Sequence, residues 1–242
     1  MRMSIRTTDE SQRNAARVAG LLYLVVVLSG PFVLIYVPGK LFVPGDATAT
    51  ASNILAHESL FKAHILVGLI SELCFIAVVL ALYRLLRRVS VELATLMVIV
   101  VLIDAPLAFL RVANEVATLT FVRGADLLAV FNKPQRDALA TLLANADSQG
   151  LLLVSNMFWG LWLLPLGWLV YRSGFLPRLL GGWLFVNGLA YLVIGATGVV
   201  FPQQLKLVST IATPFLFGEV AFMLWLLIVG VRLDVTRKES AA

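Results

Sequence analysis

Residues 18–39 read VAGLLYLVVVLSGPFVLIYVPG, a stretch without a single charged side chain. A helix needs about 20 mostly apolar residues to cross the hydrocarbon core of a bilayer. The stretch is too long for the hydrophobic region of a secretory signal peptide, and no small-x-small cleavage site follows it. We therefore expect a permanent membrane span.

Further segments of similar length and character follow along the chain. The other expected spans cover residues 63–83, 93–118, 148–171, 179–201 and 207–231. Over the 242 residues, 60% are apolar and 14% are charged, against about half and about a quarter in ordinary soluble domains. Together with a mean hydropathy of +0.92, this composition excludes a soluble enzyme, a disordered chain and a nucleic-acid-binding domain, despite a pI near 9.7.

The fold class expected from this pattern is an all-α polytopic membrane protein, a six-transmembrane-helix bundle with two short outer-surface helices. The short helices are expected within the two longer loops, at residues 47–58 and 134–146. Residues 18–232 would form one transmembrane domain, with tails at 1–17 and 233–242. Gly181, Gly188 and Gly195 repeat every seven residues and predict a flat helix face for close packing.

The basic residues indicate the orientation. Twelve of the 19 Lys and Arg residues fall on the side that carries both termini, six on the other side, and Arg111 lies within a span. Basic loops stay in the cytoplasm, so both termini are expected there. The basic excess is thus a topology signal that also favours contact with membrane lipids, and it does not indicate nucleic acid.

Several short motifs occur in a specific order along nearly the whole chain. They are ARVAGLLYL at 16–24, VPGDA at 43–47, NI at 53–54, ESLF at 58–61, YRSGFLPR at 171–178 with LG at 180–181, GE at 218–219, LWLL at 224–227 and GV at 230–231. Together they resemble a bacterial integral-membrane family catalogued as domain of unknown function 4386. The resemblance implies a six-helix, multi-pass protein of the bacterial inner membrane. In that family a histidine often follows Gly-Leu in span four, where this chain has Trp162.

Charged residues inside the expected spans are the functional lead. Glu72 and Asp104 lie near the middle of spans two and three, and Glu219 lies near the middle of span six. Each ionised, unpaired charge at mid-bilayer costs about 2.5–3.5 kcal/mol. These acids therefore need protonation, a partner or a bound cation.

Span three offers one basic partner. At 100° per residue, Asp104, Ala108, Arg111 and Glu115 fall within an arc of about 60°. Arg111 is one turn from Glu115, so these two can pair within the helix. Asp104 is about 10 Å of rise from Arg111 and needs help from another helix to reach it.

The four acids outnumber this single embedded base, so at least two acids should be protonated or face an aqueous cavity. The leading hypothesis is therefore a protein that binds or transports a small molecule or lipid through a cavity lined by these acids. The expected ligand- or proton-binding residues are Glu72, Asp104, Arg111, Glu115 and Glu219, with Ser71, Asn156 and Asn187 as cavity-lining residues. A cationic ligand would suit them, and the same polar residues can instead join helices by hydrogen bonds.

Two alternatives stay open. One is a non-catalytic structural or regulatory membrane subunit, whose buried polar groups hold helices to each other or to a partner. The other is an intramembrane enzyme, for which Ser71 beside Glu72 is the one adjacent pair on offer. Hydrolase, phosphate-binding and dinucleotide-binding motifs are absent, and the two histidines have no metal-ligand spacing, so no catalytic residue, metal or cofactor is expected. The single cysteine, Cys74, excludes an intrachain disulfide and a cysteine-based zinc site.

Overall fold

The computed structural model describes residues 2–124, 128–145 and 150–231, and no strand occurs within these ranges. The helices are α1 (Arg2–Pro31), the π-helical turn η1 (Phe32–Tyr36), α2 (Val37–Leu41), α3 (Ala47–Ala56), α4 (Glu58–Leu86), α5 (Val91–Arg123), α6 (Lys133–Asn145), α7 (Leu152–Arg172), α8 (Arg178–Val200), the 3₁₀ turn η4 (Pro202–Gln204) and α9 (Leu205–Ile228). The expected all-α class is confirmed. The predicted C-terminal tail, 233–242, lies outside the described residues.

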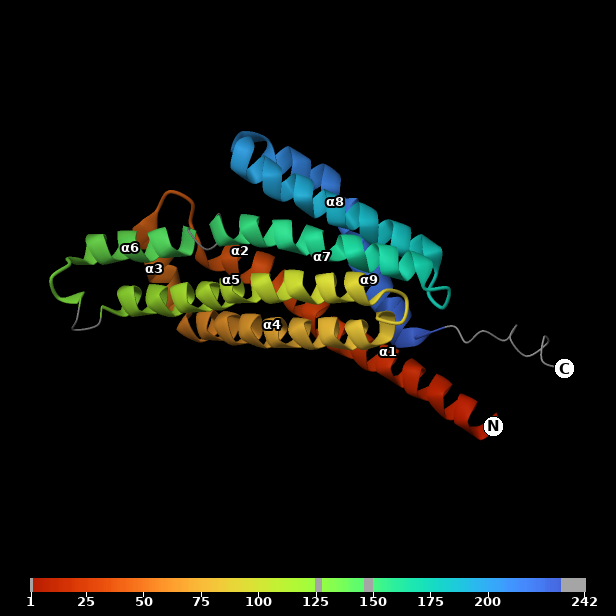
Figure 1. Cartoon of the computed structure of the whole chain (residues 1–242). Coiled ribbons are helices and arrows are strands. Elements are labelled where there is room, and N and C mark those ends of the chain that lie inside the picture. The colour runs from red at the N-terminus through yellow and green to blue at the C-terminus, as the bar shows by residue number, and fades with distance from the viewer. Residues whose placement is uncertain (1, 125–127, 146–149, 232–242) are drawn as a thin grey trace. The chain divides into compact units, whose positions relative to one another are not determined.

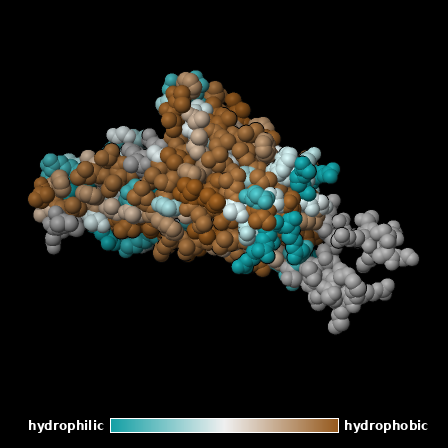
Figure 2. Space-filling model, viewed as in Figure 1, coloured by the Kyte–Doolittle hydropathy of each residue, from teal (hydrophilic) through white to brown (hydrophobic). Residues whose placement is uncertain are grey.

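Within the described residues, six helices are long and apolar enough to cross a membrane, as predicted. They cover Gln12–Leu41, Glu58–Leu86, Val91–Arg123, Leu152–Arg172, Arg178–Val200 and Pro202–Ile228. Hydrophobic residues cover most of the face visible in Figure 2, and many large apolar side chains are exposed. Such a surface is expected where lipid rather than water is the solvent. Helix α1 already begins at Arg2, so helix continues into the segment predicted as an N-terminal tail.

The chain forms two compact units. Unit 1 combines Met1–Leu24, Phe75–Leu102 and Asn156–Ala242, and unit 2 combines Val25–Cys74 and Ile103–Ser155. Helices α1, α4, α5 and α7 each contribute residues to both units. The prediction of a single transmembrane domain over residues 18–232 stays a prediction.

In unit 1, glycines bring neighbouring helices into backbone contact. A Cβ atom on Gly181 of α8 would lie 2.5 Å from the Tyr171 nitrogen of α7, and one on Gly188 would lie 2.9 Å from the Gly160 carbonyl oxygen. The predicted flat face of α8 is therefore confirmed at these two positions, and it packs against α7. Helices α8 and α9 run side by side (Figure 1), and the Trp183 indole donates a hydrogen bond to the Phe215 carbonyl oxygen at 3.1 Å.

In unit 2, the two short helices α3 and α6 lie side by side (Figure 1). Gly45 has φ +80°, a conformation that glycine adopts without strain, and it turns the chain into α3. Asp46 caps that helix by accepting a hydrogen bond from the Ala49 nitrogen at 2.8 Å. The core of this unit joins both helices to α2, α4 and α5 through Val37, Leu41, Ala51, Ile54, Phe61, Ile65, Leu119, Val122 and Ala140.

Candidate functional site

A serine joins two of the predicted site residues in unit 2. The Arg111 Nη1 atom donates a hydrogen bond to Ser155 Oγ at 2.9 Å, and Ser155 Oγ donates to Asp104 Oδ1 at 2.8 Å. Asp104 is 2% exposed and Ser155 is fully buried. Arg111 and Asp104 lie on α5 and Ser155 on α7, so this residue of α7 bridges the two charges that α5 alone holds too far apart.

Glu115 pairs with a histidine rather than with Arg111. The distance from His64 Nε2 on α4 to Glu115 Oε1 on α5 is 2.9 Å, and His64 is buried against the Phe61 ring. Glu115 thus contacts a histidine of α4 and Arg111 contacts a serine of α7, whereas the sequence also allowed the two to pair with each other within α5. The physical reason is that a neighbouring helix offers each side chain a better-placed partner at its own depth.

Glu72 of α4 faces the same group of charges. The charges of Asp104 and Arg111 both act on its carboxylate. Its Oε1 atom is buried and has no hydrogen-bond partner among the described residues. The neighbouring Ser71 is engaged elsewhere, because its Oγ atom accepts a hydrogen bond from Ser29 Oγ at 2.7 Å. The structure therefore gives no support to a Ser71–Glu72 catalytic pair.

The site residues described so far on α4 and α5 include more acids than bases. Three carboxylates, those of Glu72, Asp104 and Glu115, compare with two basic groups, the Arg111 guanidinium and the His64 imidazole. If His64 is neutral, the surplus is two negative charges, and if it is protonated, the surplus is one. Buried charges of one sign need a proton or a cation to offset them. Within the described residues, no cluster of three or more His, Cys, Asp or Glu side chains is arranged to hold a metal ion.

Glu219 of α9 lies in unit 1, within a cage of hydrogen-bond donors. The Tyr23 hydroxyl of α1 donates to Glu219 Oε1, and the polar side chains of Tyr191 and Asn187 of α8 lie close enough to interact with this carboxylate. Asn187 Nδ2 donates to the Leu216 carbonyl oxygen at 3.3 Å. One donor from α1 and two polar side chains of α8 thus surround an acid that would be costly to bury alone.

An aromatic group packs beside this cage. The Trp162 ring of α7 lies 6.4 Å from the Tyr23 ring and 5.0 Å from the Phe75 ring, measured between centroids. Trp162 is 1% exposed, so it fills the core of unit 1 at the position where the resembled family often has histidine. Asn156, another predicted cavity-lining residue, is also buried in unit 1.

The predicted site residues thus fall into two groups. Glu72, Asp104, Arg111, Glu115 and Ser71 belong to unit 2. Glu219, Asn156 and Asn187 belong to unit 1. That all of them line one cavity stays a prediction.

Sequence reasoning missed four partners: His64, Ser155, Tyr23 and Tyr191. For His64 a signal was present, because it lies about as far from the start of α4 as Glu115 lies from the end of α5. Consecutive antiparallel helices place such residues at equal depth. Ser155 and Tyr23 come from helices that do not neighbour their partners' helices in the sequence, and nothing in their own segments marks them. Tyr191 lies on α8, the helix directly before α9, and its residue type alone does not mark it as a partner of Glu219.

Comparison with known proteins gives a family. The model of a family described as a domain of unknown function (DUF4386) matches residues 18–230. This match confirms the resemblance drawn from the motifs. An uncharacterized protein of Archaeoglobus fulgidus is 29% identical over 162 residues, which are 66% of this chain and 78% of that protein. No solved structure matches the chain.

Proposed function

We propose that this chain, which belongs to the family described as domain of unknown function DUF4386, binds or transports a small molecule or lipid with a positively charged group. Glu72 and Asp104 would receive this group in unit 2, and Arg111 would set the local charge. We propose that Glu219 is the further acid of the site, as the sequence predicts.

The main support for this proposal is the Glu72 carboxylate oxygen that has no hydrogen-bond partner among the described residues. Asp104 and Glu115 both accept hydrogen bonds or pair with a base, whereas Glu72 Oε1 is buried without a partner in the described chain. A buried acceptor left unsatisfied costs about 1–3 kcal/mol, and more when it is charged. A bound proton or a cationic ligand would remove that cost. The surplus of carboxylates around Arg111 supports a positively charged group over an anion.

The basic residues also bear on where the protein lies. We propose that the protein lies in the bacterial inner membrane with both termini in the cytoplasm. The excess of Lys and Arg on the side of the termini supports this orientation.

Native mass spectrometry tests the binding proposal on the full chain, extracted gently from its own membrane. Wild type is compared with Glu72→Gln, Glu219→Gln and the control Asp137→Asn. Asp137 is a buried acid of α6 that pairs with Lys133 at 2.6 Å, outside the proposed site. We expect a stoichiometric bound molecule in wild type and in the control, and its loss in Glu72→Gln.

Each variant decides a separate point. Retention of the bound molecule in Glu72→Gln overturns the proposal. Loss in Glu219→Gln as well supports a contribution of Glu219 to binding, whereas retention there restricts the binding residues to those of unit 2. Loss in the Asp137 control would show that any change to a buried acid releases the molecule, which also contradicts a specific site.

A structural or regulatory subunit is the second candidate, and the polar contacts between helices favour it. His64 to Glu115 joins α4 to α5, Ser155 joins α7 to α5, and Tyr23 to Glu219 joins α1 to α9. These contacts are what such a subunit needs to hold its helices in place. A bare wild-type chain that co-extracts with a stoichiometric second protein would support this function over ligand binding.

A further inference from the structure

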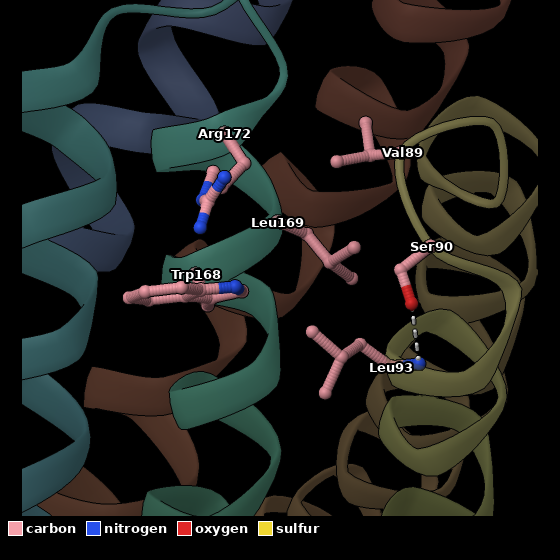
Figure 3. A pocket seen from close by; sticks show the side chains of 6 residues that line it. All are labelled: Val89, Ser90, Leu93, Trp168, Leu169 and Arg172. Carbon is pink, nitrogen blue, oxygen red and sulfur yellow. Dashed lines mark hydrogen bonds between the residues drawn. The ribbon is translucent and has the colours of Figure 1, made fainter.

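A pocket of about 230 Å³ lies within unit 1, where the turn between α4 and α5 meets the last turn of α7. Figure 3 shows the Arg172 guanidinium stacked above the Trp168 ring on one side and the Leu93 and Leu169 side chains pointing toward one another. The remaining lining residues, Val89 and Ser90, come from the turn that precedes α5. This pocket shares no residue with the acids described above.

Arg172 supplies the pocket's positive charge. Its guanidinium carbon lies 5.1 Å from the centroid of the Trp168 ring, and no carboxylate in the described part of the chain lies within ion-pair distance of it. Arg172 is exposed, and Trp168 is 46% exposed. An unpaired guanidinium held over an aromatic face presents its N–H groups in a fixed plane, which suits bidentate contact with a phosphate.

The other polar group of the pocket is already engaged. The Ser90 hydroxyl donates to Glu92 Oε2 at 2.7 Å, and Ser90 Oγ accepts a hydrogen bond from the Leu93 nitrogen at 3.2 Å. Glu92 itself does not line the pocket. Arg87 and Arg88 directly precede Val89 in the same turn, so the surroundings are basic overall.

Four of the six residues that line the pocket are apolar, while its accessible lining surface is more polar than apolar, and the pocket lies at the ends of membrane-spanning helices. α4 ends at Leu86, α5 begins at Val91 and α7 ends at Arg172. Tryptophan beside arginine at a helix end is typical of the level at which lipid headgroups lie. Leu96, one turn beyond Leu93 on α5, is 47% exposed and continues the apolar surface toward the middle of the helix.

We propose that this pocket binds the phosphate of an anionic phospholipid headgroup, with Arg172 on the phosphate and with Trp168, Leu93 and Leu169 against the glycerol and upper acyl carbons. The phosphate chemistry is shared with soluble phosphates. The apolar side chains of Trp168, Leu93 and Leu169 favour the lipid, because they can contact its glycerol and upper acyl carbons, which a soluble phosphate lacks. The inference is independent of the function proposed for the buried acids.

Lipid titration followed by native mass spectrometry tests the site on the full chain in detergent. The probes are phosphatidylglycerol, the zwitterionic phosphatidylcholine and soluble glycerol 3-phosphate. Arg172→Gln removes the charge, and Arg172→Lys keeps the charge but loses the planar fork. The matched control is Arg178→Gln, because Arg178 also lies over an aromatic ring, that of Tyr171 at 5.9 Å, but does not line the pocket.

We expect one tightly bound phosphatidylglycerol on wild type and on Arg178→Gln. Its apparent affinity should fall about fivefold in Arg172→Gln, which is the effect of one basic residue near an anionic lipid surface, and by less in Arg172→Lys. If Arg172→Gln and Arg178→Gln lose the same affinity for phosphatidylglycerol, the loss reflects the protein's overall charge, and the proposed site is overturned. Equal binding of phosphatidylcholine, or saturable binding of glycerol 3-phosphate that competes with the lipid, would overturn the assignment to an anionic phospholipid. Circular dichroism shows whether each variant is folded. If Arg172→Gln does not fold, the comparison of wild type with Arg172→Lys tests the proposal.

Discussion

Ser155 has a hydroxyl that accepts from Arg111 and donates to Asp104, which lets a neutral side chain connect two opposite charges about 10 Å apart along α5. The positions of the two charges on one face of α5 follow from helical spacing and could be predicted. Their connection could not, because it depends on which residue of α7 reaches the same depth. A serine in an apolar segment carries no signal of that role.

Replacing Ser155 by alanine should therefore destabilise the protein by about 1–3 kcal/mol, since it removes a hydroxyl that joins the buried Asp104 carboxylate to the Arg111 guanidinium. The free energy of unfolding can be measured by titrating mixed micelles with a denaturing detergent. The control is Thr120→Ala, because Thr120 is exposed and its hydroxyl only donates to the Val116 carbonyl oxygen of its own helix. That control should change stability by less than about 0.5 kcal/mol. Equal stability of Ser155→Ala and wild type would show that the bridge contributes nothing.

Glu219 illustrates the same limit at a second residue. A lone acid in the middle of an apolar segment marks a buried charge, and hydropathy alone identifies it. Its polar neighbours include Tyr23 and Tyr191, whose rings fit any apolar helix and whose hydroxyl partners cannot be recognised without the packing. The sequence thus predicts which acids need a partner, but it does not show which residue is that partner.

At the scale of single elements, hydropathy predicted the six long helices and underestimated the length of the first three. Span two was expected at 63–83, and α4 covers Glu58–Leu86. Hydropathy marks the part of a helix that suits hydrocarbon, whereas backbone hydrogen bonding continues into the polar ends. The N-terminal end of α4 begins with Glu58, which forms an ion pair with Arg123 at the end of α5. The start of α3 could be predicted from the residue type, because Asp46 caps that helix as aspartate commonly does.

The glycine face of α8 gives a prediction at this scale. Gly181→Ala should destabilise the α7–α8 contact by about 1–3 kcal/mol, because the new Cβ would overlap the Tyr171 backbone and force the helices apart. Gly182 is its control, since a Cβ there meets no atom within 4 Å. Gly182→Ala should be neutral or stabilise by up to about 1 kcal/mol through helix propensity. The same detergent titration measures both, and a Gly181→Ala protein as stable as Gly182→Ala would contradict the packing.

For the whole molecule, composition identified the class because lipid-facing helices expose apolar residues that no soluble fold could cover. The division into two compact units was not foreseen. Its boundaries fall inside helices α1, α4, α5 and α7, where neither loops nor changes of composition mark them. Between apolar helices, packing depends on small residues and scattered polar contacts, so the pattern of hydropathy does not reveal which halves of which helices associate.

The orientation of the chain is the prediction that belongs to this scale. Helix α5 has 33 residues and is about 50 Å long, which exceeds the hydrocarbon thickness of about 30 Å, so its two ends should lie on opposite sides of the membrane. The excess of basic residues places the α4–α5 turn in the cytoplasm. In a Cys74→Ala background, we choose Arg88→Cys in that turn and Val130→Cys beyond the other end of α5, where Val130 is 83% exposed. A membrane-impermeant maleimide added to intact cells should label Val130→Cys and leave Arg88→Cys unlabelled.

Opening the membrane should then label both variants equally, while the Cys74→Ala parent stays unlabelled throughout. The permeabilised sample thereby separates a sheltered cysteine from one on the cytoplasmic side. Labelling of Arg88→Cys in intact cells, with Val130→Cys protected, would invert the topology. The Arg172 pocket, which shares the α4–α5 turn, would then face the outer leaflet, and its lipid would have to come from there. Because charge bias alone sets the predicted orientation, this measurement also tests whether the basic residues around that turn act as a topology signal.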